Sequence, residues 1–204
     1  MMNVPAKQLK KQRLELILLF ALPIIGVLLM TAYYFYVIEN QTEMGTHNKG
    51  VLVSPPKPMS ELALIAKDTA YKLDDGSGKW TFLVVGGASC NDDCVSQLYL
   101  TRQIKEALGK YKLRIRNVYL MTASSEPTLN LLNVLDSDYQ NHELLKVDAS
   151  AFNAWASKEQ PELNSLQGVQ FYVVDPAGWL MMYYTTEHNY KQVISDMKFL
   201  IKNS

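Results

Sequence analysis

Cysteine and histidine are scarce in this chain, and their scarcity excludes several kinds of protein. There are two cysteines and three histidines among 204 residues. Both cysteines lie in one short segment, so the chain is neither a disulfide scaffold nor a zinc module that needs four ligands. Any chemistry that the cysteines perform therefore requires the two of them together.

An excess of charge of either sign is also lacking. Twenty basic residues balance twenty acidic ones, and charged residues make up 20% of the chain. Nucleic-acid binding favours a basic surface, and disorder favours a high net charge with few apolar residues. We therefore expect no nucleic-acid partner, and the length suits one folded domain plus an anchor.

The motifs of common enzyme classes are missing as well. Serine and aspartate residues show neither the nucleophile-elbow spacing nor the triad spacing of hydrolases. Gly86 and Gly87 lack the further glycines and the lysine of a phosphate-binding loop. These absences exclude hydrolase and nucleotide-binding functions.

A long uncharged segment near the amino terminus predicts a membrane-spanning helix. Residues 16–38 contain no charged side chain, and at about 1.5 Å per residue they exceed the ~30 Å hydrocarbon thickness. Pro23 is tolerated in a bilayer helix, and Tyr33, Tyr34 and Tyr36 suit the outer headgroup region. A cleavable signal peptide is the alternative, but it would have a shorter apolar core and a small-residue cleavage site. We therefore expect the segment to stay as an anchor.

Charged residues on the two sides of this segment predict its orientation. Basic residues precede it, namely Lys7, Lys10, Lys11 and Arg13, whereas Glu39 and Glu43 follow it. The positive-inside rule then leaves residues 1–15 in the cytoplasm and the rest of the chain outside. Residues 39–60, which include Pro55, Pro56 and Pro58, predict an extended stalk. This stalk could be a plain spacer or a docking loop for a partner.

Residues 61–204 alternate between apolar β-prone runs and helical periodicity, which is typical of an α/β layer fold. The pattern predicts strands at 80–85, 115–121, 169–175 and 179–184, and helices near 95–108, 127–135, 152–155 and 193–201. Pro176-Ala177-Gly178 predicts the turn of a hairpin between the last two strands. The order βαβα followed by ββα is that of a thioredoxin-like fold.

The cysteine pair lies where the first strand of this domain is followed by its helix. Backbone N–H groups and the helix dipole favour a thiolate at such a position, although Asp92 and Asp93 between the cysteines should temper its reactivity. The spacing of Cys90 and Cys94 permits either a disulfide or a soft-metal site. A static disulfide is the alternative. A disulfide between residues so close in the chain removes little entropy from the unfolded state and therefore stabilises the fold only slightly. A redox or metal role explains the position of the two cysteines better.

Two segments resemble the Sco (SenC/PrrC) family, and the similarity extends from about Trp80 onward. They read TFLVVGGASCNDDC at residues 81–94 and FYVVDPAG at residues 171–178. The resemblance implies a thioredoxin-like, copper-binding accessory factor for cytochrome c oxidase assembly, more an assembly factor or metallochaperone than an enzyme. It also implies the bacterial cytoplasmic membrane, a domain in the periplasm, and an oxidase subunit or assembly factors as partners.

The chain departs from the family pattern at the expected metal ligands. Asn91 and Val95 replace the prolines that usually follow each cysteine, and Gln167 occupies the position of the third copper ligand, a histidine. Cys90 and Cys94 are therefore the expected redox pair and the possible copper ligands. We expect His47, His142 and His188 to be solvated surface or loop residues. At least one of Met181 and Met182 should pack in the core rather than serve copper.

Two other functions remain open. One is a periplasmic thiol-disulfide oxidoreductase, although residues 167–169 lack the proline that such enzymes carry before the penultimate strand. The other is a non-catalytic interaction domain with a structural disulfide. Reduction potential separates these two, because structural disulfides lie below about −300 mV.

The charge asymmetry around the apolar segment generates a topology prediction. An export-dependent reporter fused after Ser204 should be active, because the positive-inside rule places everything beyond Ile38 outside the cytoplasm. Enzyme activity of the fusion in intact cells is the measurement. Activity of a reporter that works only in the cytoplasm would overturn the predicted orientation.

Overall fold

The computed structural model describes residues 6–41, 48–158 and 168–204. The chain consists of two compact units, Met1–Thr46 and His47–Ser204.

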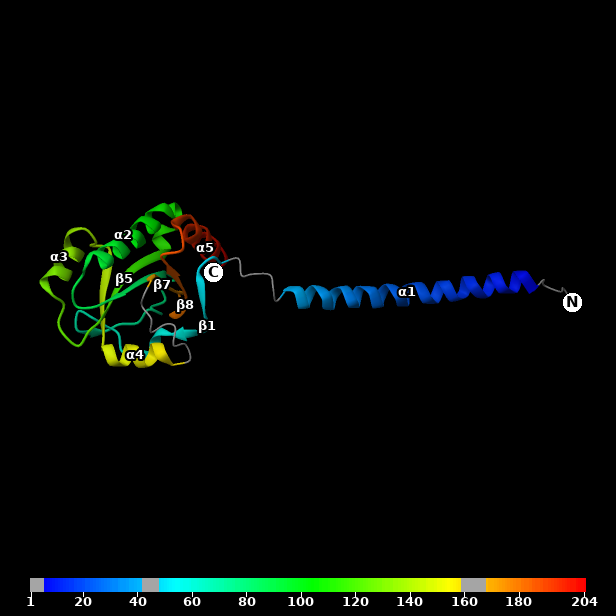
Figure 1. Cartoon of the computed structure of the whole chain (residues 1–204), viewed down its shortest axis with the longest axis horizontal. Helices are drawn as coiled ribbons and strands as arrows, with labels where there is room; N and C mark the ends of the chain where they lie inside the picture. Colours follow the sequence, from blue (N-terminus) through cyan, green and yellow to red (C-terminus); the bar gives the residue numbers. More distant parts are fainter. Residues whose placement is uncertain (1–5, 42–47, 159–167) are drawn as a thin grey trace. The chain divides into compact units, whose positions relative to one another are not determined.

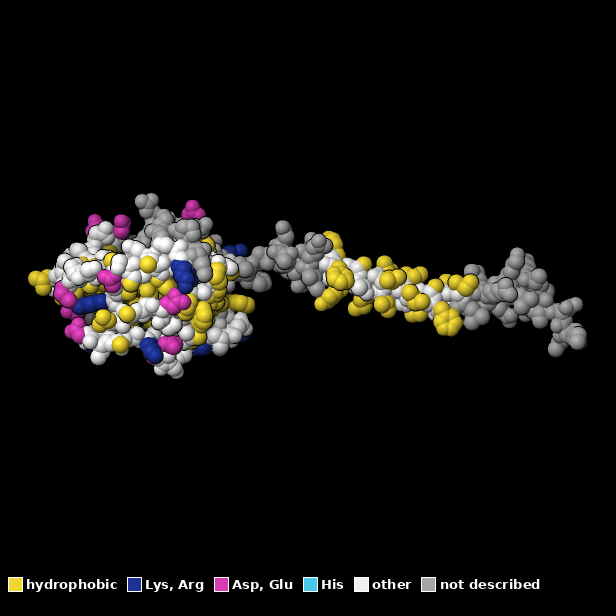
Figure 2. Space-filling view, turned by 90° about the horizontal axis from the view of Figure 1, so that it is seen from below, with side chains coloured by type: hydrophobic (Ala, Val, Ile, Leu, Met, Phe, Trp, Pro, Cys, Tyr) yellow, Lys and Arg dark blue, Asp and Glu magenta, His cyan; other side chains and the backbone are white. Residues whose placement is uncertain are grey.

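The described residues of the first unit form helix α1 (Ala6–Gln41), with Pro23 inside it. Its segment Ile17–Tyr36 has a mean hydropathy of 2.2, and none of the most apolar window is buried. Figure 2 shows apolar side chains along this segment. By length and composition it is a candidate membrane anchor, in agreement with the predicted span, although a signal sequence has the same properties.

The second unit is built on an eight-stranded sheet in the order β1-β8-β7-β4-β5-β6-β2-β3. Strands β4, β5 and β6 are parallel, and β7, β8 and β1 follow one another in antiparallel pairs on the other side of β4. The short strands β2 and β3 extend the sheet beyond β6. The strand bounds are β1 Val51–Pro58, β2 Ile65–Ala66, β3 Thr69–Ala70, β4 Trp80–Gly86, β5 Ile115–Thr122, β6 His142–Val147, β7 Val169–Val174 and β8 Trp179–Thr185.

Helices cover both faces of the sheet (Figure 1). They are α2 Asp92–Ala107, α3 Leu129–Ser137, α4 Ala149–Ser157 and α5 Tyr190–Asn203, with 3-10 turns at Met59–Glu61 and Gly109–Arg114. Successive side chains of a strand point to opposite faces, so Phe82 and Val84 of β4 pack with α2, α3 and α5. Leu83 packs on the other face with α4. This arrangement confirms the predicted α/β, thioredoxin-like fold.

Part of the predicted stalk belongs to the sheet instead. Strand β1 pairs with β8, with Val51 opposite Tyr183 and Lys57 opposite Leu180, and its register shifts in the proline-containing stretch between them. Proline lacks an N–H donor, yet an edge strand with an irregular register tolerates it. The prediction of a spacer is therefore wrong for residues 51–58. Strands β2, β3 and β6 were also not predicted.

A buried carboxylate fixes the first residues of the second unit. Asp196 of α5 accepts hydrogen bonds from the N–H groups of Lys49 and Gly50 at 2.6 and 3.0 Å, and from the Tyr184 hydroxyl at 3.1 Å. A Cβ at Gly50 would lie 2.7 Å from the Tyr184 ring, so only glycine fits there. Since β1, β8, β7 and β4 alternate in direction, the start of β1 lies at the same end of the sheet as the end of β4.

His142 is buried at the start of β6, which corrects the expectation of a solvated residue. Its Nε2 lies 3.1 Å from the Thr101 hydroxyl of α2, its ring packs edge-on against Tyr139, and its Nδ1 has no hydrogen-bond partner. Burial disfavours the charged ring and lowers the pKa of His142 to about 4 from its ordinary 6.5, and Lys105 and Arg102 add to this. The hydrophobic face of the sheet thus contains a neutral imidazole.

This buried imidazole predicts that the domain loses stability in mild acid. The unfolded chain takes up a proton as the pH falls through 6.5, whereas the folded chain resists protonation until about pH 4. Relative to His142→Gln, the parent should lose about 3 kcal/mol of unfolding free energy between pH 7 and pH 4. Urea unfolding of the full chain in detergent, followed by tryptophan fluorescence, measures this difference. All three tryptophans lie in the second unit, and an identical pH dependence in both proteins would contradict the prediction.

Candidate functional site

The cysteine pair lies at the end of the sheet, between β4 and α2. Asn91 is the N-cap of α2 and has extended backbone angles, and its side chain accepts the N–H of Cys94 at 3.0 Å. Asp92 and Asp93 occupy the first turn, where negative charge suits the helix dipole. Helix α2 therefore begins at Asp92, two residues after Cys90, at the junction of strand and helix where the sequence analysis places the cysteine pair.

Cys90 and Cys94 form a disulfide, with their Cα atoms 5.2 Å apart. Both side chains are buried and belong to the core cluster beneath α2. Cys90 precedes the helix, so the bond joins a loop to the first helical turn rather than two positions on one helix face. The presence of a disulfide agrees with the sequence analysis, whereas its reversibility stays a prediction.

A tyrosine supports the loop that carries Cys90. The hydroxyl of Tyr119 in β5 donates to the carbonyl of Gly87 at 2.9 Å, and Thr122 donates to the carbonyl of Gly86 at 3.2 Å. Burial raises the pKa of Tyr119 to about 12, so the phenol remains a neutral donor. A Cβ at Gly86 would lie 2.1 Å from the Tyr119 hydroxyl, so glycine is required by this close approach.

Helix α3 provides a contact that sequence reasoning missed. Asn130 Oδ1 accepts the N–H of Cys90 at 3.0 Å and the Ser89 hydroxyl at 3.3 Å. The N–H of Thr128, the N-cap of α3, donates to the carbonyl of Ala88 at 2.8 Å. Asn130 is 40 residues from Cys90 in the chain, and nothing in its neighbourhood in the sequence distinguishes it from a solvated helix residue.

The expected third metal ligand falls at Gln167, which lies outside the described residues, as does His47. His142 lies at the opposite end of the sheet from the disulfide, because β4, β5 and β6 are parallel and it begins β6. The described residues contain no group of three His, Cys, Asp or Glu that could hold a metal ion. Met182 is fully buried in the core, as expected for at least one of the two methionines.

His188 follows β8 in a loop, as expected, and both of its ring nitrogens have partners. Thr185 N–H donates to Nδ1 at 3.1 Å, so Nδ1 is an acceptor. Nε2 then carries the proton and donates to the Lys49 carbonyl at 2.8 Å. His188 therefore helps to hold the start of the domain and is not free to bind a metal in this arrangement.

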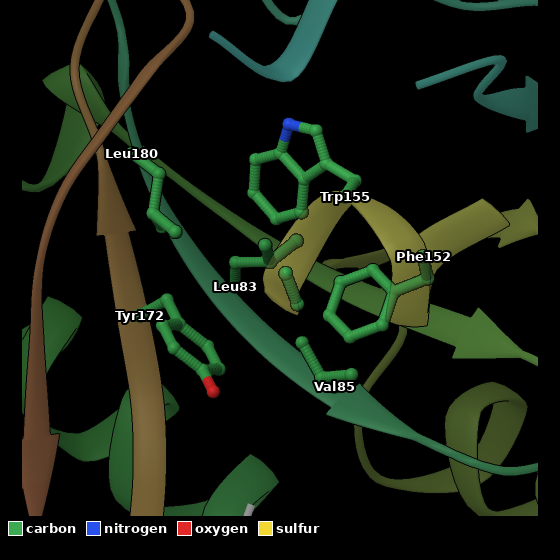
Figure 3. Close-up of a pocket in the computed structure, with 7 residues that line it drawn as sticks. Leu83, Val85, Phe152, Trp155, Tyr172 and Leu180 are labelled. Atoms are coloured by element: carbon green, nitrogen blue, oxygen red, sulfur yellow. The ribbon is translucent and has the colours of Figure 1, made fainter. Parts of the chain in front are cut away.

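A cavity lies between the sheet and α4, on the face of the sheet opposite the cysteine pair (Figure 3). It is too small to be a ligand site. Its volume is about 10 Å³, at the lower limit for a single water molecule. Apolar side chains from β4, β7, β8 and α4 enclose it, namely Leu83, Val85, Tyr172, Leu180, Phe152, Trp155 and Ala156. This cavity therefore offers no room for a ligand between the sheet and α4.

Comparison with solved structures finds the same fold in Sco proteins. Apo Sco1 from Thermus thermophilus matches with a TM-score of 0.55 and 18% identity, over 77% of this chain and 98% of that chain. Copper-bound yeast Sco1 matches with a TM-score of 0.53 and 15% identity, over 77% and 93%. BsSco, described as a Sco family member with a disulfide switch, matches with a TM-score of 0.51 and 18% identity, over 77% and 97%.

Comparison of sequences identifies a family as well. No curated protein matches this chain. A family model described as the transmembrane-like, thioredoxin-like, C-terminal domain matches residues 80–204, which is more than half of the chain. The predicted resemblance to Sco is confirmed at the level of the fold, since the structural neighbours are Sco/SenC proteins. The chain belongs to the transmembrane-like, thioredoxin-like family.

Proposed function

We propose that this protein is a membrane-anchored thiol-redox factor in cytochrome c oxidase assembly that acts through Cys90 and Cys94. The observation that carries the proposal is the disulfide between the loop and the first turn of α2, on a Sco-like fold. One structural neighbour is described as having a disulfide switch and as belonging to a family of cytochrome c oxidase assembly proteins. The localisation that goes with this function is the bacterial cytoplasmic membrane, with the domain in the periplasm.

The proposed chemistry is disulfide exchange with a dithiol of an oxidase subunit or assembly factor. A partner thiolate attacks one sulfur of the Cys90–Cys94 bond, which breaks as a mixed disulfide forms, and the other sulfur leaves as a thiolate and takes up a proton. The second partner thiol, once deprotonated, attacks the mixed disulfide and releases the remaining cysteine. Two electrons and two protons pass from the partner dithiol to the cysteine pair, and the partner becomes a disulfide.

A structural disulfide explains the same bond less well. Closing so short a loop removes little entropy from the unfolded chain, so the bond contributes modestly to stability. The domain also has an extensive core on both faces of its sheet. A domain with this much buried apolar surface does not depend on a short-range disulfide in order to fold.

Copper handling is the second candidate function, and two structural neighbours favour it. Yeast Sco1 and Arabidopsis ScoI were both crystallised with copper bound. Two free thiolates at Cys90 and Cys94 suit Cu(I), a soft ion that accepts low coordination. The disulfide must therefore be reduced before the pair can hold copper. The resemblance to the family places Gln167 at the position of the third copper ligand. Its neutral amide is a poorer donor than imidazole, so the site should bind copper more weakly.

The redox proposal predicts a reversible disulfide in the folded full-length protein. Both cysteines should resist alkylation in air, react after mild reduction, and become protected again on oxidation, while tryptophan fluorescence reports a folded domain throughout. The reduction potential should lie above about −300 mV, since working redox pairs lie above structural disulfides. Alkylation followed by mass spectrometry is the measurement.

Two variants control this test. Cys94→Ser should leave Cys90 alkylatable in the monomeric protein before and after reduction, because the chain then has no second cysteine for an intramolecular bond. In the host bacterium, Cys90→Ser and Cys94→Ser should each fail to restore cytochrome c oxidase activity to a deletion strain. A pair that can be reduced only by unfolding the domain, or full restoration by both variants, would refute the proposed function.

The copper hypothesis predicts a preference for the reduced ion. The reduced protein should bind Cu(I) with weak or moderate affinity and Cu(II) poorly, because Cu(II) prefers imidazole among its ligands. Gln167→His should strengthen copper binding and create a sulfur-to-Cu(II) charge-transfer absorption, which Cys90→Ser should remove. Anaerobic Cu(I) titration and visible absorption of Cu(II) samples measure these effects. Tight Cu(II) binding by the parent would contradict the assignment of a weak site.

A further inference from the structure

Asparagine side chains hold the backbone N–H groups of both cysteines. Asn91 Oδ1 accepts the N–H of Cys94, and Asn130 Oδ1 accepts the N–H of Cys90, each at 3.0 Å. The first contact is an ordinary N-cap, local to α2. The second reaches across from α3 and therefore requires a separate explanation.

The contact of Asn130 is not needed to dock α3. Leu131 and Leu135 anchor the helix in the core, and Thr128 caps it and donates its N–H to Ala88. Ser89, Asn91 and Asn130 are all exposed, so water could satisfy the loop if the asparagine were absent. The hydrogen bond to Cys90 is thus an addition to a helix that is already fixed.

We propose that Asn130 is a positioning residue of the redox pair, which holds Cys90 at closing distance from Cys94 and occupies the N–H beside its sulfur. This inference rests on the proposed redox function of the disulfide. The Cα atoms of the two cysteines are 5.2 Å apart, within the usual disulfide range of about 4.4–6.8 Å. Asn130 and Ser89 keep the loop in this position when the bond is opened.

Two physical effects of this contact favour the disulfide over the dithiol. A constrained loop keeps the two thiols at a high effective concentration, which promotes closure of the bond. An N–H that donates to Asn130 is not available to stabilise a thiolate on Cys90, which disfavours the reduced, ionised form. Removal of the asparagine oxygen should therefore shift the equilibrium toward the dithiol through both effects.

The test is the equilibrium of the full-length protein in detergent with reduced and oxidised dithiothreitol. In this exchange dithiothreitol supplies the two electrons and two protons and becomes the cyclic disulfide. Asn130→Ala should shift the equilibrium constant toward the dithiol by about five- to tenfold, since a hydrogen bond contributes about 1 kcal/mol. A tenfold shift corresponds to about 30 mV.

Two further variants separate positioning from a general structural effect. Asn130→Asp keeps an oxygen acceptor and adds negative charge beside Cys90, so its equilibrium constant should stay within twofold of the parent or move toward the disulfide. Asn133→Ala alters an exposed residue of the same helix and should leave the constant within twofold. In a Cys94→Ser background, Asn130→Ala should also move the pH profile of Cys90 alkylation to lower pH, because the freed N–H can then stabilise the thiolate.

The outcomes distinguish this inference from the proposed function. If the parent disulfide is reversible but folded Asn130→Ala stays within twofold of the parent, the role of Asn130 is refuted and the redox function remains. An equal shift in Asn133→Ala would assign the effect to α3 as a whole and would also refute that role. If the parent cannot be reduced without unfolding, both proposals fail together.

Discussion

The burial of β4 on both faces is the constraint from which the site follows. This strand pairs with β5 on one side and β7 on the other, and its side chains enter both core clusters. The strand ends at Gly86, where glycine is required because the hydroxyl of Tyr119 in β5 occupies the space of a Cβ. The loop, the cap at Asn91 and the position of Cys90 are then fixed by the end of the strand.

Local patterns in the sequence predicted much of this arrangement, whereas contacts distant in the chain escaped prediction. The apolar β-prone run at residues 80–85 and the helical spacing after Asn91 correctly predict β4 and α2, because both signals come from neighbouring residues. The prolines of β1 argued against a strand, because a proline removes a backbone hydrogen bond unless the strand lies at the edge of the sheet. The sequence does not show which strand is the edge. The burial of His142 involves Thr101 of α2, a residue 41 positions away in the chain. The contact of Asn130 could not be predicted from its sequence neighbours, because it is made with Cys90, a residue 40 positions away.

The electrostatics around the sulfurs favour the closed pair. The N-terminus of α2 alone would promote thiolate formation through its N–H groups and dipole. Here Asn91 and Asn130 accept the N–H groups of the two cysteines, and Asp92 and Asp93 add negative charge in the first turn. Each of these features opposes a second negative charge at the site. The position is thus one that suits the proposed redox pair, while its surroundings favour the disulfide.

This stabilisation links the two proposed functions, thiol redox and copper handling, through one equilibrium. Cu(I) can bind only the reduced pair, so its apparent affinity falls in proportion to the fraction of protein that is reduced. Any contact that favours the disulfide, including that of Asn130 with Cys90, therefore weakens copper binding by the same free energy, whether or not it touches the metal. A strongly reducing partner would keep the cysteine pair reduced and so allow copper to bind. An oxidising partner would restore the disulfide and prevent copper binding. Under the two proposals, the reduction potential of the cysteine pair and its occupancy by copper both report the same equilibrium between the disulfide and the dithiol.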